Sequence, residues 1–508
     1  MSRFNVQLTI DHEQGGKASC VRPSTHNASF ITHHYLLCCL LFAVAANSCM
    51  VGPNFQHTKD AIDSTEVYRY DSLQLAMTDS VLNIKWWEMF QDPIIDTLIH
   101  IGLNENKDVL IASARIDQAW AALGKAKAEI WPSFGYSGAA NRGNSVQGLQ
   151  LPSTTNTFNG FGTLHWEIDF WGKYRRASEA ARAELLASEY GKRAIQIGLI
   201  SFITGTYYQL LDYKWRLDIS RKTLELRQKS ENIIQARFDE GIVAEIDLNQ
   251  AQIQRAIAAS AVPVFQRQVA QTENALSILL GRNPGSIPTG IELQNQELTP
   301  DIPVGIPSML LTRRPDLLQL EELLHAQNAR IGIAVAQRFP SISLTGMLGV
   351  ASNELSEITN SDALFNIGGS IMGPLFEFGR NKRRVEIERA ITEQVLYEYE
   401  FAVITAFQEV EDALVEISTL KEEMVARRDH VAAAQNAQFL SGELYDKGVT
   451  SYLEIIESQR QAFEAQLNLS QTTQQLFNAY VKLYKALGGG WLSEEEMIAA
   501  QQEADPTE

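Results

Sequence analysis

Cysteine is almost absent from this 508-residue chain, and its four cysteines all lie within the first 49 residues. The remainder therefore has no internal disulfide, no cysteine-based zinc site and no cysteine nucleophile. Positive charge is also in deficit, with 43 Lys and Arg against 61 Asp and Glu, a formal net charge of −18. Nucleic-acid binding depends on cations that meet phosphates, so we expect no nucleic-acid partner.

Long apolar runs are missing as well. No stretch of eighteen consecutive apolar residues occurs, which argues against a polytopic helical membrane protein. The longest run, Tyr35–Ala46, has about twelve residues, too few to span a bilayer and typical of a signal peptide. A stretch that resembles a bacterial lipoprotein processing box follows it, Ala46-Asn47-Ser48-Cys49.

This box predicts that residues 1–48 form a signal peptide and that the thiol of Cys49 receives lipid. Two acyl chains on one cysteine suffice for stable membrane anchoring, whereas a single chain does not. The alternative is an ordinary signal peptide with an incidental cysteine. The long stretch before Tyr35 also leaves open a translation start later than Met1.

Histidine is scarce, at nine residues, and shows no HxxxH or HExxH spacing. Gly488-Gly489-Gly490 could be mistaken for a phosphate-binding loop, but it ends a predicted helix and no Lys-Ser/Thr follows it. The sequence therefore predicts a protein that is not an enzyme, with no cofactor and no metal site.

The body of the chain is an internal repeat with an offset of 207 residues. Trp171-Gly172-Lys173 corresponds to Phe378-Gly379-Arg380, and Phe238–Val243 corresponds to Tyr445–Thr450. We therefore divide the mature chain into an N-terminal lipidated segment, a first repeat, a proline-rich linker, a second repeat and an acidic tail. The predicted boundaries are 49–91, 92–281, 282–315, 316–490 and 491–508.

Each repeat contains two segments in which apolar and polar residues alternate. The alternation predicts four strands, some longer than ten residues and so long enough for tilted membrane strands. They are Ser133–Ala140, Phe158–Phe170, Phe339–Val350 and Leu364–Leu375, with loops expected at 141–157 and 351–363. A half-buried soluble sheet is the alternative, but the sequence offers no second apolar layer to pack on the polar faces.

Very long helices follow the strands. Tyr174–Phe238 and Asn381–Asp446 contain no proline, and each would extend roughly 98 Å at the rise of an α-helix. Return helices then lead to Gly281 and Gly488. Shorter helices are expected at 92–130 and 316–337. The last return helix has a coiled-coil seam with steps of three and four residues. Helices of this length require lateral packing into a bundle or tube.

In their order, several short motifs resemble the TolC-like outer-membrane efflux factors, specifically their lipoprotein branch. The resemblance covers residues 49–491, and each motif is weak alone whereas the ordered set is specific. The motifs are Cys49 with Val51–Phe55, Trp86-Trp87, Asp92-Pro93, Trp166–Gly172, Arg313–Leu317, Arg330–Gly332 before Phe339–Ser341, Pro374–Phe376 with Phe378-Gly379, and Leu483–Trp491.

The resemblance implies a mixed α and β membrane protein. Three chains would each give four strands to one twelve-stranded outer-membrane β-barrel, which a periplasmic α-helical barrel continues. The lipid-anchored homotrimer would be the exit duct of a tripartite efflux system in the bacterial outer membrane. It would passively export small toxic compounds that an inner-membrane RND-type transporter delivers through a periplasmic membrane-fusion adaptor.

The alternative function is a non-pore coiled-coil adaptor or a structural envelope protein, which the four alternating strands disfavour. Multidrug, metal-ion and protein export all remain open for an exit duct. The chain has only nine methionines and no methionine cluster in the predicted lumen segments, which argues mildly against copper or silver.

Two groups of residues are candidate functional sites at the helical hairpins. The tips, Gly241, Ile242 and Val243 with Gly448, Val449 and Thr450, are expected to contact the adaptor. Their glycines should have positive φ, and the alternative is that they merely reverse the chain.

By the resemblance, a gate follows the second tip. Leu453 takes an apolar ring position, Glu454 and Glu457 take acidic ones, and Arg460 takes a basic one. Six carboxylates around a trimer axis would attract cations. The alternatives are a capping box of Ser451 with Glu454, and a surface ion pair of Glu457 with Arg460.

Overall fold

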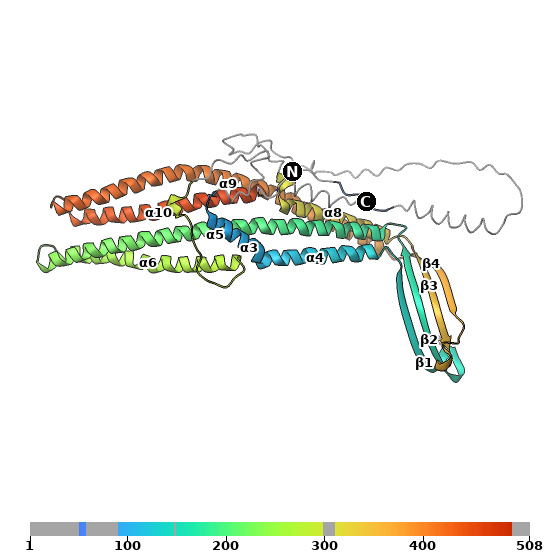
Figure 1. Cartoon of the computed structure of the whole chain (residues 1–508). Helices are drawn as coiled ribbons and strands as arrows, with labels where there is room; N and C mark the ends of the chain where they lie inside the picture. Colours follow the sequence, from blue (N-terminus) through green and yellow to red (C-terminus); the bar gives the residue numbers. More distant parts are fainter. Residues whose placement is uncertain (1–49, 57–89, 147–148, 298–309, 490–508) are drawn as a thin grey trace, which may run out of the picture. The chain divides into compact units, whose positions relative to one another are not determined.

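The computed structural model describes residues 50–56, 90–146, 149–297 and 310–489 (Figure 1). The signal peptide, the lipidation at Cys49, residues 57–89 of the N-terminal segment and the acidic tail fall outside these residues. The first repeat contains α3 (Pro93–Glu105), α4 (Lys107–Ala128), β1 (Ser133–Val146), β2 (Leu149–Ile168), α5 (Lys173–Asp239) and α6 (Glu245–Leu279). The second contains α8 (Pro315–Ala336), β3 (Ser341–Ser352), β4 (Leu364–Met372), α9 (Arg380–Asp446) and α10 (Tyr452–Ala486). Short helical turns are η3 (Leu293–Asn295), α7 (Leu310–Arg313) and η5 (Leu355–Glu357).

The four strands form one antiparallel sheet in the order β1-β2-β3-β4. Strand β2 pairs with β3, so the sheet joins the two repeats through residues such as Phe161, which lies opposite Gly349. Strands β1 and β4 each pair on one side only within this chain. The sheet therefore ends in two edges that no strand in the described part of the chain covers.

The predicted loop at 141–157 is wrong, because most of it belongs to β1 and β2. The ladder continues from Asn141 opposite Thr157 to Gly143 opposite Thr155, and it shifts register before Ser145. Backbone hydrogen bonds form this hairpin, and they do not require the alternation of side chains on which the prediction depended. Strand β4 also ends three residues earlier than predicted, where Gly373 and Pro374 follow Met372, since proline cannot donate to a ladder.

The predicted long helices are confirmed to within one residue at each end. Helices α5 and α9 each contain 67 residues, and α6 and α10 each contain 35. The single helix expected at 92–130 is wrong, because Asn106 has extended backbone angles and divides it. The Asn106 side chain accepts hydrogen bonds from the backbone of Asp108 and Val109, at 2.8 and 3.2 Å, and so caps α4.

One apolar core joins both repeats. Helix α5 packs on α3, α4, α6, α8 and α10, while α9 packs on α8 and α10 (Figure 1). Buried side chains from four long helices share this core, among them Tyr207, Leu276, Val403 and Phe477. Among the described residues, no helix combines the length and the apolar character that crossing a membrane requires.

Two adjacent buried tyrosines of α5 differ in their hydrogen bonding. The Tyr207 hydroxyl donates to Asp92 Oδ2 at 2.9 Å and accepts from the Gly290 backbone N–H at 2.8 Å. It therefore ties α5 to the start of α3 and to the segment after α6. The hydroxyl of Tyr208 is buried and makes no hydrogen bond within the described part of the chain.

Tyr207→Phe should lower the free energy of unfolding by about 1–2 kcal/mol, because it leaves the Gly290 N–H without its acceptor. Tyr208→Phe is the matched control and should change stability little, since it removes a hydroxyl that has no partner. Denaturant titration followed by circular dichroism measures both. Equal losses in the two variants would contradict this assignment.

Candidate functional site at the hairpin tips

The two hairpin tips have the same backbone geometry. Gly241 and Gly448 have φ values of 73° and 75°, which confirms the predicted positive φ. After each glycine, the next backbone N–H bonds back to the helix: Ile242 to the carbonyl of Arg237 at 2.8 Å, and Val449 to that of Leu444 at 2.9 Å. This is the Schellman arrangement, which satisfies the last carbonyls of a helix.

Each tip presents one aliphatic side chain to solvent. Ile242 is 71% exposed and Val449 is 70% exposed. Val243 instead packs against the apolar cluster behind the tips, and Thr450 is half-buried. The two hairpins thus expose one aliphatic side chain each, at equivalent places of the two repeats.

The two tips also contact each other, which sequence reasoning missed. Behind them lies an apolar cluster with members from all four long helices, and Tyr445 and Tyr452 pack there with ring centroids 5.6 Å apart. The Arg237 guanidinium lies 4.9 Å from the centroid of the Tyr445 ring, a cation–π contact between the first and second hairpins. The repeat offset paired Phe238 with Tyr445 in sequence, but it gave no sign that the two tips touch.

The predicted gate residues lie on the exposed side of the first turns of α10. Leu453 is 60% exposed, and Glu454 and Glu457 are also exposed. The residues between them, such as Ile455 and Ile456, are buried against the neighbouring helices. The fold therefore brings the four predicted gate residues together on one face, and their side chains are not used in the core of the chain.

Arg460 lies between two glutamates of its own helix. Its Nη2 and Nε donate to Glu457 at 2.6 and 3.0 Å, and its Nη1 donates to both carboxylate oxygens of Glu464 at 2.9 Å. The hydrogen bond from Arg460 lowers the pKa of Glu457 to about 2, and Glu457 in turn raises the pKa of Arg460. The surface ion pair considered from the sequence is therefore present.

The capping box considered for Ser451 and Glu454 does not form. Ser451 occupies the N-cap position of α10 but makes no side-chain cap hydrogen bond. The Glu454 carboxylate instead accepts a hydrogen bond from the Thr450 hydroxyl. The Glu454 carboxylate is therefore hydrogen-bonded to Thr450, whereas in a capping box it would accept from the backbone N–H of Ser451.

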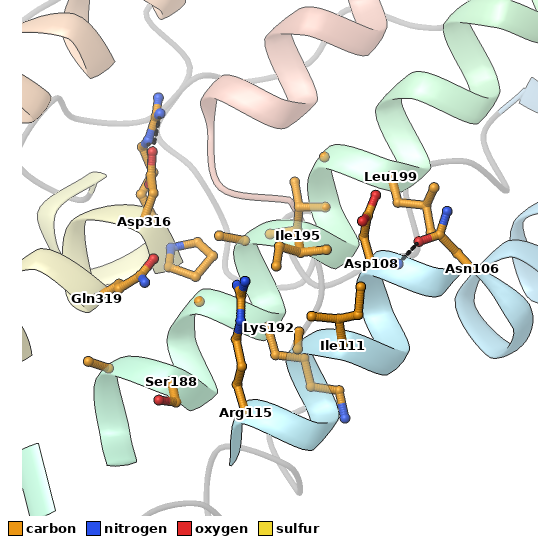
Figure 2. Close-up of a pocket in the computed structure, with 18 of the residues that line it drawn as sticks. Asn106, Asp108, Ile111, Arg115, Ser188, Lys192, Ile195, Leu199, Asp316 and Gln319 are labelled. Carbon is orange, nitrogen blue, oxygen red and sulfur yellow. Dashed lines mark hydrogen bonds and ion pairs between the residues drawn. The ribbon is translucent and has the colours of Figure 1, made fainter. Parts of the chain in front are cut away.

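A second feature is a cavity of about 850 Å³ between α4, α5 and α8 (Figure 2). Ile111, Ile195 and Leu199 form part of its apolar lining, while Arg115 and Lys192 bring positive charge from α4 and α5. Its lining residues include no histidine or cysteine, so the lining has no imidazole base to pair with a nucleophile and no thiol nucleophile. Within the described residues, no group of three or more His, Cys, Asp or Glu side chains could hold a metal ion.

Comparison with known proteins agrees with this architecture. A sequence model described as outer membrane efflux protein matches residues 98–282 and 306–489. The chain is 31% identical over 452 residues to the cation efflux system protein CusC of Escherichia coli O6:H1, covering 88% of this chain and 97% of the relative. It is 32% identical over 425 residues to the probable efflux pump outer membrane protein TtgC of Pseudomonas putida, covering 82% and 87%.

Solved structures are similar over most of their length. A crystal structure of CusC matches with a TM-score of 0.77 at 29% identity, covering 87% of this chain and 100% of that one. The CmeC outer membrane channel of Campylobacter jejuni matches with a TM-score of 0.80 at 26% identity, covering 90% and 98%.

Proposed function

The chain belongs to the outer membrane efflux protein family, and from this membership we propose that it is the outer-membrane exit duct of a tripartite efflux system. In this proposal an inner-membrane RND-type transporter delivers small toxic compounds through a periplasmic membrane-fusion adaptor, and the duct conducts them passively. Family membership disfavours the alternative of a non-pore coiled-coil adaptor or structural envelope protein.

The unpaired edges of the sheet are the observation that supports a homotrimer. Strand β1 exposes Phe134 and Tyr136, and strand β4 exposes Ile367 and Ile371, all on strands that pair on one side only. A sheet with unpaired edges is not tolerated in lipid, so these edges require partners. Three copies with four strands each would close a twelve-stranded barrel.

Helices α6 and α9 also have exposed apolar sides. Helix α6 packs chiefly on α5 and exposes Ile246, Ile253 and Ile257. Helix α9 packs on α8 and α10 and exposes Phe401 and Ile404. We propose that α6 of one copy meets α9 of the next and closes an α-helical barrel. The equal lengths of α5 and α9, and of α6 and α10, support two internal repeats at 92–281 and 316–490.

The hairpin tips are the proposed contact with the adaptor, because Ile242 and Val449 are exposed aliphatic residues at both reversals. This proposed surface also includes Gly241, Val243, Gly448 and Thr450.

The proposed gate of the periplasmic end consists of Leu453, Glu454, Glu457 and Arg460. Cys49 is the proposed lipid anchor in the outer membrane, and the mass of the N-terminal peptide of the mature protein tests it.

We propose a broader range of exported compounds than the name of any one relative states. CusC is named for cation efflux, whereas other relatives are named for toluene and antibiotic efflux. We propose that selection takes place in the transporter, and that the duct itself is permissive. The scarcity of methionine in the chain continues to disfavour copper or silver as the cargo.

Disulfide cross-linking of the two sheet edges tests the trimer. The double variants combine Phe134→Cys on β1 with Ile367→Cys on β4, or with Phe365→Cys or Ile371→Cys to cover other registers. After oxidation, they should yield covalent trimers on a denaturing gel. Phe134→Cys with Leu348→Cys is the control, because β3 lies between β2 and β4 of its own chain. Monomers alone in every edge pair would overturn the proposed closure.

A further inference from the structure

The segment Met50–Gln56, which we call the strap, lies against α5 and α8. The Val51 backbone N–H donates to the Trp171 carbonyl at 3.2 Å, just before α5 begins. Gly52 has a φ of 101°, and a Cβ at this position would lie 2.4 Å from the Gly332 Cα on α8. Only glycine permits this conformation together with this close approach of two backbones.

A buried arginine binds the carbonyl groups of the strap. Arg176 on α5 is 1% exposed. Its Nε donates to the Val51 carbonyl at 3.3 Å, and its Nη2 donates to the Gly52 carbonyl at 3.3 Å and to Asn54 Oδ1 at 2.8 Å. Its Nη1 donates to Glu179 at 2.8 Å, so the buried cation is also paired.

The far end of the strap meets a histidine between two carboxylates. The rings of Phe55 and His325 stack with centroids 4.6 Å apart and an interplanar angle of 13°. His325 Nε2 lies 3.4 Å from Glu179 Oε1, and Nδ1 lies 3.4 Å from Glu322 Oε2. That oxygen of Glu322 is buried and makes no hydrogen bond among the described residues.

We propose that His325 is a protonation-dependent clamp for the strap. A neutral imidazole has one N–H and can donate to only one of the two glutamates, whereas the imidazolium can donate to both. Its positive charge also strengthens the stacking on Phe55. The strap itself contains no ionisable side chain. The charged groups around His325 are therefore Glu322 on α8, and Glu179 on α5 with Arg176 paired to it.

The direction of the pH dependence follows from these neighbours. Glu322, and then Glu179, raise the pKa of His325 above its usual value, although partial burial opposes them. A histidine whose pKa is raised by folding stabilises the folded arrangement below its ordinary pKa, about 6.5. This contribution is lost as the pH rises through the higher value in the folded protein. The strap should therefore be held in mild acid and loosened in base.

Hydrogen exchange of the strap amides tests the clamp in the full-length protein in detergent. Protection factors, corrected for the intrinsic exchange rate at each pH, should fall about tenfold between mild acid and mild base, the worth of one charge-assisted hydrogen bond. His325→Gln should be poorly protected at both pH values. His325→Arg keeps a permanent cation that can stack on Phe55, so it should stay protected at both. His100→Gln, on the exposed side of α3, is the control and should behave as the wild type.

Equal protection of the wild-type strap at both pH values would overturn the clamp. So would a fall of wild-type size in His325→Gln. Because the strap begins directly after Cys49, the clamp would set how firmly the residues beside the proposed lipid anchor are held.

Discussion

Arg460→Gln should raise the cation selectivity and the conductance of the channel in planar bilayers severalfold. In the wild type, Arg460 is hydrogen-bonded to both Glu457 and Glu464, so one cation compensates two carboxylates on each chain. Removing it would leave those carboxylates uncompensated around the axis of the proposed trimer, and rings of uncompensated carboxylates favour cations. The shorter glutamine side chain would also leave more room at the proposed gate.

The variant should also acquire a pH dependence that the wild type lacks. The hydrogen bond from Arg460 holds the pKa of Glu457 at about 2, so Glu457 stays ionised in mild acid. Without Arg460, its pKa should return toward the ordinary value for glutamate, about 4.3. The added selectivity should therefore be present at neutral pH and decline as the pH falls toward that value.

Two comparisons make this result specific to the proposed gate. Lys482→Gln removes a cation from the other end of α10, where it pairs with Glu416, and should leave selectivity unchanged. Glu454→Gln with Glu457→Gln should reduce cation selectivity. Unchanged selectivity in Arg460→Gln, with the trimer intact, would exclude these residues as the charged ring.

Arg314→Met should lower the free energy of unfolding by about 3 kcal/mol, because it removes a buried cation from a network of three partners. Arg314 precedes α8 and is 5% exposed. It donates to Asp316 at 2.6 Å, to Glu409 on α9 at 2.6 Å and to the Ala486 carbonyl at the end of α10 at 3.1 Å. Both carboxylates are partly exposed, which keeps the expected loss at the lower end for a buried ion pair.

Arg330→Met is the matched control on α8. Arg330 forms an exposed ion pair with Glu184, and such pairs contribute about 1 kcal/mol or less. Denaturant titration followed by circular dichroism measures both variants, and losses of the same size would contradict a special role for Arg314. Arg314→Lys should not restore full stability, because an ammonium group lacks the fork that reaches several acceptors.

Acid should narrow the difference between Arg314→Met and the wild type. Burial alone would raise the pKa of Asp316, but the hydrogen bond and charge of Arg314 lower it on balance. A carboxylate whose pKa is lowered by folding stabilises the protein above its ordinary pKa, about 3.9. This contribution disappears as the pH falls through the lower value in the folded protein, and the variant lacks the share of it that Arg314 supplies.

The sequence alone determined the two longest helices, their ends and the existence of the four strands. Proline-free periodic stretches and the glycines at 172, 241, 379 and 448 are local signals, and local hydrogen bonding is enough to begin and end a helix. It also determined which residues of α10 share a face, because Leu453, Glu454 and Glu457 follow from helical periodicity.

Only the tertiary structure decided which distant residues meet. Most of the 141–157 segment became strand because two backbones pair there, although its side chains do not alternate. The contacts of Arg237 with Tyr445, of Arg176 with the strap and of His325 with Phe55 join residues that are far apart in the chain. Side chains such as these carry no local pattern, since their roles depend on which helices pack together, and that choice is made by the shared apolar core.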